Sequence, residues 1–389
     1  MRILVVHNKY KKSNVGGEDI VYENEVDCLQ SQLGKDNVFT YEVSNDDISR
    51  KELMFGIWYS KKFYNSIKKV IKENDINLVH VHNFYPLLTP SVFKASKDAG
   101  AKVVHTLHNY RLWCISGILY RDGYGQCELC VNKKVSWAGI LNRCYRRSFL
   151  QSFVAQCSFW FYRSTRVFNN IDFFFVLTEF QKQKVISFGI EESRVILKPN
   201  SVNVYKRISS YKSGYIFVGR LEESKGIVEL LKVWRDLDNG FFLTIIGDGE
   251  LRESLKDEYR QDNISFLGKC SREKTLSKIS NSKYLIQPSF VYETFGLTII
   301  EAMSCGVPVI GFDIGTRQNF IKNGINGFLC EPLHLKSVVE NSYNYDNYGV
   351  LCVNAIETAK SFTNNCVIEK QILIYKDIVD GNLIRGDCR

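Results

Sequence analysis

The stretch 283–311 constrains the fold of this chain more than any other. A short apolar run at its start ends at Pro288, which indicates a buried strand. Residues 297–303 then carry apolar side chains at helical spacing, and Gly306 with Pro308 ends that helix just before a second apolar run. A strand, a loop, a helix and another strand in this order are typical of an α/β domain.

Two carboxylates belong to this unit, Glu293 in the loop and Glu301 inside the helix. If helical rise applied throughout, their Cα atoms would be ~12 Å apart. Between them, Gly296 and Leu297 begin the helix, with unpaired N–H groups and the positive end of its dipole. Such a site predicts a diphosphate in the middle and a polyol at each end, which is the shape of a nucleotide sugar. Pairs of Glu residues at this spacing are common, so the prediction depends on the whole segment 283–311 and not on the pair alone.

This string resembles the Glu-x7-Glu signature of the retaining family-4 glycosyltransferases. Their fold, GT-B, consists of two facing Rossmann-like domains with parallel sheets, and a C-terminal helix that crosses back to the first domain. The resemblance implies that Glu293 contacts the transferred sugar and that Glu301 holds the ribose. It also implies that the amides of Gly296 and Leu297 hold the diphosphate.

Further residues of the donor site are expected in two glycine-bearing segments. Arg220 at a strand end and Lys225 before a helix suit a diphosphate, and their segment resembles the Gly-Arg…Lys-Gly element of the family. A glycine pair lies where the first strand meets the first helix, and the resemblance places Gly17 beside the donor. Residues 315–319 depart from the Gly-Gly and Glu that relatives often have there.

Two strands of the first half end in a His-Asn pair, His82-Asn83 and His108-Asn109. In open α/β sheets, ligands bind beyond the carboxyl ends of the strands. A lone His is more often a structural hydrogen-bonding group, and this is our interpretation of His82. The segment ending at His108 resembles the family's Thr-x-His strand end, which implies that His108 reaches the donor sugar and joins Glu293 as a catalytic residue.

A loop over residues 112–147 contains four cysteines with the spacing Cys-x12-Cys-x2-Cys-x13-Cys. Cys114, Cys127, Cys130 and Cys144 would form a tetrahedral structural zinc site that orders a long loop. The alternative is four separate small apolar side chains. A single Cys-x2-Cys pair does not decide between the two.

The length of 389 residues suits two α/β domains. No run reaches the ~18 apolar residues that a membrane span needs, and the first strand is too short for a signal-peptide core. Together with twelve cysteines, which indicate reduced thiols or a metal site, this predicts a cytoplasmic protein.

The net charge of +9 predicts an anionic partner. Residues 140–168 mix arginines with aromatic side chains, which is typical of a helix in an anionic membrane interface or, equally, of a packed helix with solvated arginines. We expect a nucleotide-diphosphate sugar as donor and no nucleic acid. Under the first interpretation of this helix, the protein is attached peripherally to the inner face of the cytoplasmic membrane.

We predict an N-terminal acceptor-side domain over residues 1–200, a linker over 201–213 and a nucleotide-sugar-binding domain over 214–363. The helix within 364–389 would pack back on the first domain. The segment from residue 105 to residue 147 resembles bacterial enzymes of surface-polysaccharide synthesis (O-antigen, capsule or exopolysaccharide), whose acceptors are usually lipid-linked saccharides.

The predicted reaction is sugar transfer with retention of configuration, without a catalytic cofactor or metal. The Asp236-Leu237-Asp238 string mimics a metal-binding motif, but it precedes Asn239-Gly240 in a turn, so we interpret it as solvated. One alternative is a GT-B epimerase or isomerase that acts on the same donors. Another is a zinc-bearing nucleic-acid-binding protein, which would leave the phosphate-site pattern unexplained.

Overall fold

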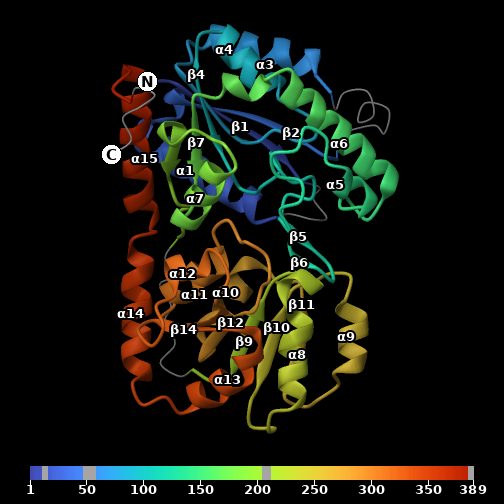
Figure 1. Cartoon of the computed structure of the whole chain (residues 1–389). Coiled ribbons are helices and arrows are strands. Elements are labelled where there is room, and N and C mark those ends of the chain that lie inside the picture. Colours follow the sequence, from blue (N-terminus) through green and yellow to red (C-terminus); the bar gives the residue numbers. More distant parts are fainter. Residues whose placement is uncertain (11–15, 47–57, 204–211, 384–389) are drawn as a thin grey trace. The chain divides into compact units, whose positions relative to one another are not determined.

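The computed structural model describes residues 1–10, 16–46, 58–203 and 212–383. The chain forms two compact α/β units, each with its own sheet (Figure 1). The first unit comprises Met1–Ile118, Glu128–Ser201 and Asn364–Arg389. The second comprises Leu119–Cys127 and Val202–Thr363. Most of the predicted linker, residues 204–211, lies outside the described residues.

The first unit is built on a six-stranded sheet with the order β2-β1-β3-β4-β7-β8. Every pair of neighbouring strands in it is parallel. The strands are β1 (Ile3–Lys9), β2 (Val38–Ser44), β3 (Leu78–Asn83), β4 (Lys102–Thr106), β7 (Phe173–Val176) and β8 (Val195–Leu197). Their near-continuous apolar burial is typical of parallel strands that are covered on both faces.

Helices cover both faces of this sheet. Alternate residues of the strands, among them Ile3, Val5 and Phe175, form one core with α1 (Gly17–Leu33) and α15 (Asn364–Asp380). The opposite face bears His105, which packs on Phe93 of α4. The remaining helices of this unit are α3 (Lys61–Glu73), α4 (Ser91–Asp98), α5 (Trp137–Leu141), α6 (Phe149–Ser164), α7 (Glu179–Ser187) and the short 3-10 turns η2 (Lys35–Asn37), η3 (Val167–Asn170) and η4 (Glu192–Arg194).

The second unit has a six-stranded parallel sheet with the order β11-β10-β9-β12-β13-β14. The strands are β9 (Tyr215–Val218), β10 (Leu243–Ile246), β11 (Ile264–Gly268), β12 (Tyr284–Gln287), β13 (Val309–Phe312) and β14 (Gly327–Cys330). A separate antiparallel hairpin, β5 (Tyr120–Arg121) with β6 (Gly125–Gln126), also belongs to this unit.

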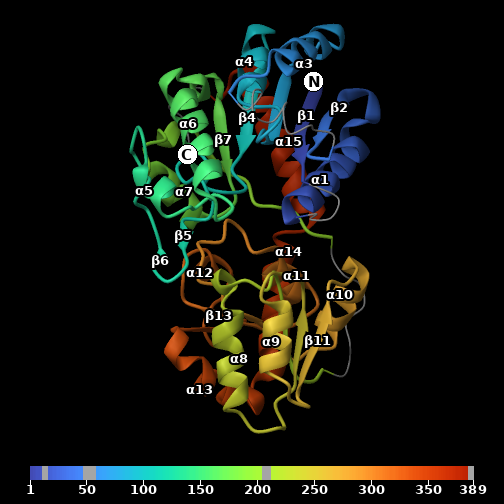
Figure 2. The same cartoon turned by 90° about the vertical axis from the view of Figure 1, so that its right-hand side faces the viewer.

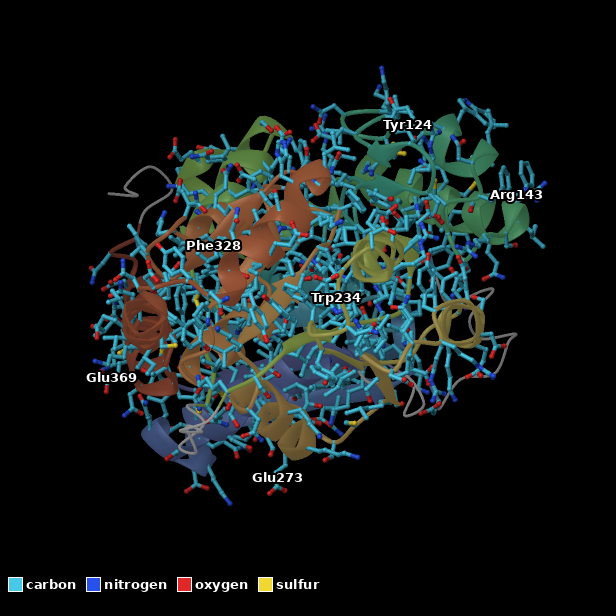
Figure 3. The ribbon with its side chains drawn as sticks, turned by 90° about the horizontal axis from the view of Figure 1, so that it is seen from below. Tyr124, Arg143, Trp234, Glu273, Phe328 and Glu369 are labelled. Carbon is cyan, nitrogen blue, oxygen red and sulfur yellow. The ribbon has the colours of Figure 1, made fainter. Side chains whose placement is uncertain are left out.

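Two helix layers enclose the second sheet as well (Figure 2). Trp234 of α8 is fully buried among strand residues such as Tyr215, and its indole N–H donates to the carbonyl of Phe241 at 3.0 Å (Figure 3). The helices are η5 (Glu223–Lys225), α8 (Ile227–Arg235), α9 (Arg252–Glu258), α10 (Arg272–Ser280), α11 (Leu297–Ser304), α12 (Arg317–Phe320), η6 (Pro332–His334), α13 (Leu335–Tyr343) and α14 (Tyr348–Lys360).

The C-terminal segment passes from the second unit to the first between Thr363 and Asn364. Residues 361–363 separate two helices, and the first of them, α14, packs on α11 in the second unit. Helix α15 then belongs to the first unit, as the resemblance implied, and buries Ile368 and Tyr375 in that core. Among the helices of the described residues, none combines the length and the apolarity that crossing a bilayer requires.

Candidate active site

The second unit brings its predicted donor residues to one edge of its sheet. Strands β9 and β12 are neighbours, and the chain continues from them toward opposite ends of the sheet. Open α/β sheets bind ligands at such a switch point, beyond the carboxyl ends of the strands. Arg220 and Lys225 follow β9, while Glu293, Gly296 and Leu297 follow β12.

The loops after β9 and β12 interlock because a glycine lets their backbones touch. Gly226 has φ +70°, and a Cβ built there would lie 1.9 Å from the carbonyl oxygen of Pro288. The amide of Phe290 donates to the carbonyl of Ser224 at 3.0 Å. This contact fixes the side chains that the two loops carry.

Lys225 and Glu293 form an ion pair across the two loops. The Lys225 Nζ lies 2.7 Å from Glu293 Oε1, and the Ser289 hydroxyl donates to the same oxygen at 3.0 Å. Burial alone would raise the pKa of Glu293, but Lys225, followed by the more distant charge of Arg317, holds that pKa below its ordinary value. Glu293 is therefore an oriented carboxylate rather than a proton donor.

Helix α11 begins at the other side of this loop. Gly296 caps it in the left-handed conformation, with φ +89° and no side-chain hydrogen bond to the first turn. The first-turn amides, beginning at Leu297, therefore offer the positive end of the helix dipole to an anion. Further along α11, Glu301 pairs with Arg272 at 2.9 Å, and burial raises the pKa of Glu301 above its ordinary value.

The predicted cations differ in their surroundings. The Lys225 side chain is 18% exposed and faces Glu293. The Arg220 side chain is 56% exposed, and its guanidinium pairs with Glu222 at 2.7 Å. Lys225 is thus built into the site, whereas Arg220 can turn toward a ligand by leaving a solvated partner.

Sequence reasoning noted residues 315–319 only as a departure from the family pattern, and the structure gives Arg317 a function there. This fully buried guanidinium donates from Nε to the carbonyl of Phe312 at 2.7 Å and from an NH2 group to the carbonyl of Ser289 at 2.6 Å. The neighbouring Thr316 hydroxyl donates to the carbonyl of Glu293. Together they anchor the loop that carries Glu293.

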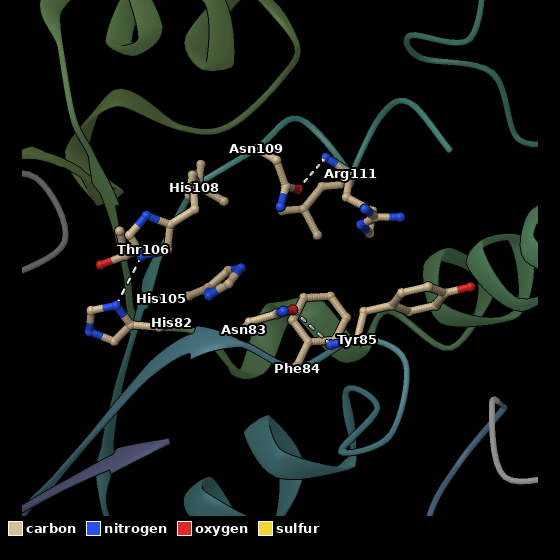
Figure 4. A pocket seen from close by; sticks show the side chains of 11 residues that line it. His82, Asn83, Phe84, Tyr85, His105, Thr106, His108, Asn109 and Arg111 are labelled. Atoms are coloured by element: carbon tan, nitrogen blue, oxygen red, sulfur yellow. Dashed lines mark hydrogen bonds between the residues drawn. The ribbon is translucent and has the colours of Figure 1, made fainter. Parts of the chain in front are cut away.

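In the first unit, the switch point lies between β1 and β3. A small pocket opens beyond the carboxyl ends of β3 and β4, and Figure 4 shows the side chains that line it. The lining residues are His82, Asn83, Phe84, Tyr85, His105, Thr106, Leu107, His108, Asn109, Arg111 and Leu112. The pocket therefore holds His108, the predicted catalytic residue, among several polar groups.

Helix α1 begins beside this pocket. Its first residue, Gly17, is exposed and follows residues 11–15, which lie outside the described part of the chain. Asn109 donates to Glu18 Oε1 at 3.0 Å, so the start of α1 is tied to the segment after His108. The predicted role of Gly17 at the donor stays a prediction.

Beneath His108 lies a buried polar network that sequence reasoning missed. The ring nitrogens His108 Nε2 and His82 Nδ1 are 2.9 Å apart, and His82 Nε2 lies 3.1 Å from Glu25 Oε1. The other oxygen of Glu25 binds the ammonium of Lys198. His82 and Glu25 are each at most 2% exposed, so the contacts beneath His108 are closed to water.

The Glu25 carboxylate also contacts side chains of β3 and α15. Gln371 donates to Glu25 Oε1 at 2.6 Å, and His80 Nδ1 lies 3.1 Å from that oxygen. The Tyr375 hydroxyl contacts the same His80 nitrogen at 2.6 Å. Burial lowers the pKa of His82 to about 3 and holds the pKa of His108 well below its ordinary value. Both rings are therefore neutral.

Glu25, His80 and His82 also form the one set of three metal-ligating side chains, among the described residues, whose ligand atoms all lie within 4.8 Å. The ammonium of Lys198 sits on the same carboxylate, which opposes a second cation there. Hydrogen bonds from protein groups already account for the three side chains. We therefore interpret this cluster as a hydrogen-bonded network rather than a metal site.

The predicted zinc ligands are divided between the two units. Cys127 belongs to the second unit, and the three thiols of the first unit, Cys114, Cys130 and Cys144, do not form a set within ligand distance. Cys114 and Cys130 are buried, which also suits small apolar side chains. Structural zinc stays a prediction, and metal analysis of the purified protein tests it.

The arginine-rich segment is not the single helix predicted over 140–168. Short α5 packs on α6. The turn between them carries Arg143, which Figure 3 labels, and also Arg146 and Arg147, and all three have positive φ. Around this turn, large apolar side chains are exposed. We call this the apolar–arginine surface, and its apolar members are Trp137, Leu141, Phe149, Leu150, Phe153 and Trp160.

Two family profiles match consecutive parts of the chain. The first, Glycosyltransferase Family 4, matches residues 42–206, and the second, Glycosyl transferases group 1, matches residues 206–342. An uncharacterized glycosyltransferase of Methanocaldococcus jannaschii is 28% identical over 198 residues, which is 49% of this chain and 55% of that protein. The match thus spans about half the length of this relative.

One relative matches nearly end to end. The O-antigen biosynthesis glycosyltransferase WbnH of Escherichia coli is 24% identical over 388 residues, which is 95% of this chain and 97% of that protein. Among solved structures, HepE of Anabaena in complex with UDP is 15% identical and has a TM-score of 0.67, with 97% of this chain and 100% of that chain covered. These matches agree with the two parallel sheets of the fold. The chain belongs to the family-4 glycosyltransferases of the GT-B fold.

Proposed function

We propose that this protein transfers a sugar from a nucleotide-diphosphate sugar to an acceptor hydroxyl, with retention of configuration and without a divalent metal. The observation that carries the proposal is the donor-side arrangement at the β9–β12 switch point. Lys225 and the start of α11 face the same loop, and a carboxylate flanks each side of that helix start. This arrangement matches a diphosphate between two polyols. The UDP bound by HepE, a structural relative, supports the same donor class.

Breaking the anomeric C–O bond leaves negative charge on the diphosphate. Lys225, Arg220 and the amides at Gly296 and Leu297 would stabilise that charge, so a divalent cation is not required. Glu293 is held by Lys225 and Ser289, which makes it a poor nucleophile. We therefore propose front-face attack, in which the donor phosphate accepts the proton of the acceptor and His108 with Glu293 orients the sugar.

The acceptor is proposed to be a lipid-linked saccharide used in surface-polysaccharide synthesis. WbnH, the relative that matches nearly end to end, is an O-antigen biosynthesis enzyme, which supports this class. Such an acceptor lies in a membrane, and the apolar–arginine surface has the chemistry of an anionic membrane interface. We propose that the enzyme works in the cytoplasm, peripherally attached to the inner face of the cytoplasmic membrane.

A donor screen followed by product analysis tests the reaction. UDP-, GDP- and dTDP-sugars are compared by thermal shift, and the stabilising donor is then incubated with lipid-linked saccharides in EDTA. We expect a new glycosidic bond with the anomeric configuration of the donor, measured by NMR. A rearranged nucleotide sugar without transfer would identify an epimerase instead, and strict dependence on Mg²⁺ or Mn²⁺ would contradict the proposed leaving-group stabilisation.

Vesicle binding tests the membrane partner. Trp137 and Leu141 are 62% and 70% exposed, so Trp137→Ser with Leu141→Ser removes apolar surface at little cost in stability. We expect the double variant to lose cosedimentation with anionic vesicles. Leu333→Ser is the control, because Leu333 is 90% exposed but lies in the second unit. Equal loss in both variants, or equal binding to neutral vesicles, would contradict the proposed surface.

A further inference from the structure

We propose that His82, held by Glu25, is a positioning residue that fixes His108 in one neutral tautomer, with the hydrogen on Nε2, and sets the orientation of the His108 ring at the pocket. The expected effect on sugar transfer rests on the proposed function, but the tautomer itself follows from contacts within the first unit. His82 thereby gains a role in the reaction, beyond the structural one expected from its sequence.

The argument begins at Glu25. An ionised carboxylate only accepts hydrogen bonds, and the adjacent Lys198 ammonium keeps Glu25 ionised in a site that is closed to water. The contact of 3.1 Å between Glu25 Oε1 and His82 Nε2 therefore requires that His82 Nε2 carries the hydrogen.

The next step concerns the other nitrogen of His82. A neutral imidazole has one N–H group and one lone pair, so a proton on Nε2 leaves Nδ1 as an acceptor. His82 is neutral because burial outweighs the favourable charge of Glu25 in setting its pKa. The contact of 2.9 Å with His108 Nε2 is then donated by His108.

The same rule fixes His108. Its ring is also neutral, so a hydrogen on Nε2 leaves the lone pair on Nδ1. His108 lines the pocket beyond β4 together with Asn109 and Arg111 (Figure 4). We infer that the contact with His82 fixes both the tautomer and the orientation of His108 at this pocket.

Other groups hold the relay in place. Gln371 of α15 donates to the same Glu25 oxygen, and the ring of Tyr22 on α1 lies edge-on to His82 with centroids 5.6 Å apart. The planes of the His82 and His108 rings are 23° apart, with centroids 5.1 Å apart, which suits an edge-to-edge hydrogen bond. The orientation of His108 is therefore set by elements that are far apart in the chain.

Imidazole NMR tests the tautomer without any need for activity. In protein labelled with ¹⁵N-histidine, we expect His82 and His108 to show a protonated Nε2 and an unprotonated Nδ1 at neutral pH. Resonances are assigned with His82→Asn and His108→Asn. An Nδ1–H tautomer or a charged ring at His108 would overturn the proposal, whether or not the protein proves to be a glycosyltransferase.

Two amide substitutions at His82, to Asn and to Gln, distinguish a role in positioning His108 from a role in packing alone. The Asn amide reaches the place of Nδ1 and can still accept from His108, whereas the Gln amide reaches the place of Nε2 and keeps only the contact with Glu25. We expect His82→Gln to lower kcat roughly 10–100-fold with a smaller change in KM, as loss of such a supporting hydrogen bond does elsewhere. His82→Asn should recover most of that loss.

The control is a substitution in the same unit outside the relay. Ile378→Val trims a buried side chain of α15 that belongs to the apolar core. It should lower the melting temperature without changing kcat. If His82→Gln is as active as His82→Asn, or if kcat falls in proportion to the melting temperature in all three variants, His82 is only structural and the proposal fails.

Discussion

Glu293 and Glu301 lie on one loop–helix segment, yet their surroundings move their pKa values in opposite directions. Glu293 has Lys225 at 2.7 Å and the charge of Arg317 nearby, and its pKa is lowered. Glu301 has one partner, the more exposed Arg272, and its pKa is raised by burial. We therefore expect changes at Glu293 and at Glu301 to have different effects on activity and stability.

Replacing Lys225 with Met should slow sugar transfer on the order of 10²-fold, because a charge that stabilises the leaving group is lost. It should also change the pH profile. In the wild type, the lowered pKa keeps Glu293 ionised even at pH values below the ordinary carboxyl pKa. The stability that the Lys225–Glu293 ion pair adds to the fold is lost only as pH falls through that lowered pKa. Without Lys225 burial dominates, so the acid limb of kcat/KM should move to higher pH.

The control for Lys225→Met is Lys232→Met. Lys232 lies on α8 of the same unit, with an exposed side chain 3.5 Å from Glu229. Its removal should leave both the rate and the acid limb unchanged. An acid limb that stays in place in Lys225→Met would mean that Lys225 does not set the charge of Glu293.

Glu301→Gln should stabilise the ligand-free protein while weakening nucleotide binding. A raised pKa means that the fold favours the protonated form, so the stability due to Glu301 is present below its ordinary pKa and is lost as pH rises through the raised value. The neutral Gln avoids that loss. We expect a higher melting temperature than wild type at neutral pH, and no difference in strongly acidic solution.

Binding of the nucleotide to the same variant should be weaker by roughly 10–100-fold, because a hydrogen bond to a charged group is worth ~1.5–3 kcal/mol. Calorimetric titration with the nucleotide measures it. Unchanged affinity would remove Glu301 from the ribose site, and a lower melting temperature at neutral pH would show that its ion pair with Arg272 outweighs burial.

At the scale of elements, the proposed donor site depends on the contact between the loops after β9 and β12. Gly226→Ala places a Cβ against the carbonyl of Pro288 and forces a left-handed conformation on Ala. We expect a loss of at least ~1–3 kcal/mol in the free energy of unfolding, together with weaker nucleotide binding because Lys225 moves away from Glu293.

Gly240→Ala is the matched control for that change. Gly240 lies in the same unit, has no neighbouring atom within 4 Å of an added Cβ, and does not have positive φ. Urea unfolding should give nearly wild-type stability for this variant. If Gly226→Ala were equally stable, the two loops would have to separate without strain, and the close contact would not be what builds the site.

Elements whose ends are marked by Gly or Pro could be predicted from sequence, whereas short strands at a sheet edge could not. Helix α11 has apolar spacing between Gly296 and Pro308, so the predicted helical residues 297–303 match its bounds closely. Strand β14 was missed because it has four residues and begins at Gly327, which gives little periodic signal.

The residues of the proposed donor site could be listed from sequence because they are grouped near strand ends. The network under His108 could not be, since Glu25, Lys198 and Gln371 come from distant parts of the chain and each alone is a common polar residue. Only the fold of the first unit brings them together.

At the scale of the whole molecule, the two units have separate sheets and separate apolar cores. The proposed donor contacts the second unit through Lys225 and α11, so it should stabilise that unit most. A ligand at 100 times its Kd adds ~2.7 kcal/mol, which corresponds to a rise of roughly 5–10 °C in a unit of this size.

Calorimetry should therefore resolve two unfolding transitions, of which saturating nucleotide raises one. The Ile378→Val substitution, which trims the core of the first unit, should lower the other transition and leave the nucleotide-sensitive one in place. Gly226→Ala should lower the sensitive transition and reduce its response to nucleotide. A single transition that all three changes move together would show that the units unfold cooperatively, and the donor's stabilisation would then be shared through α15, the helix with which the chain returns to the first unit.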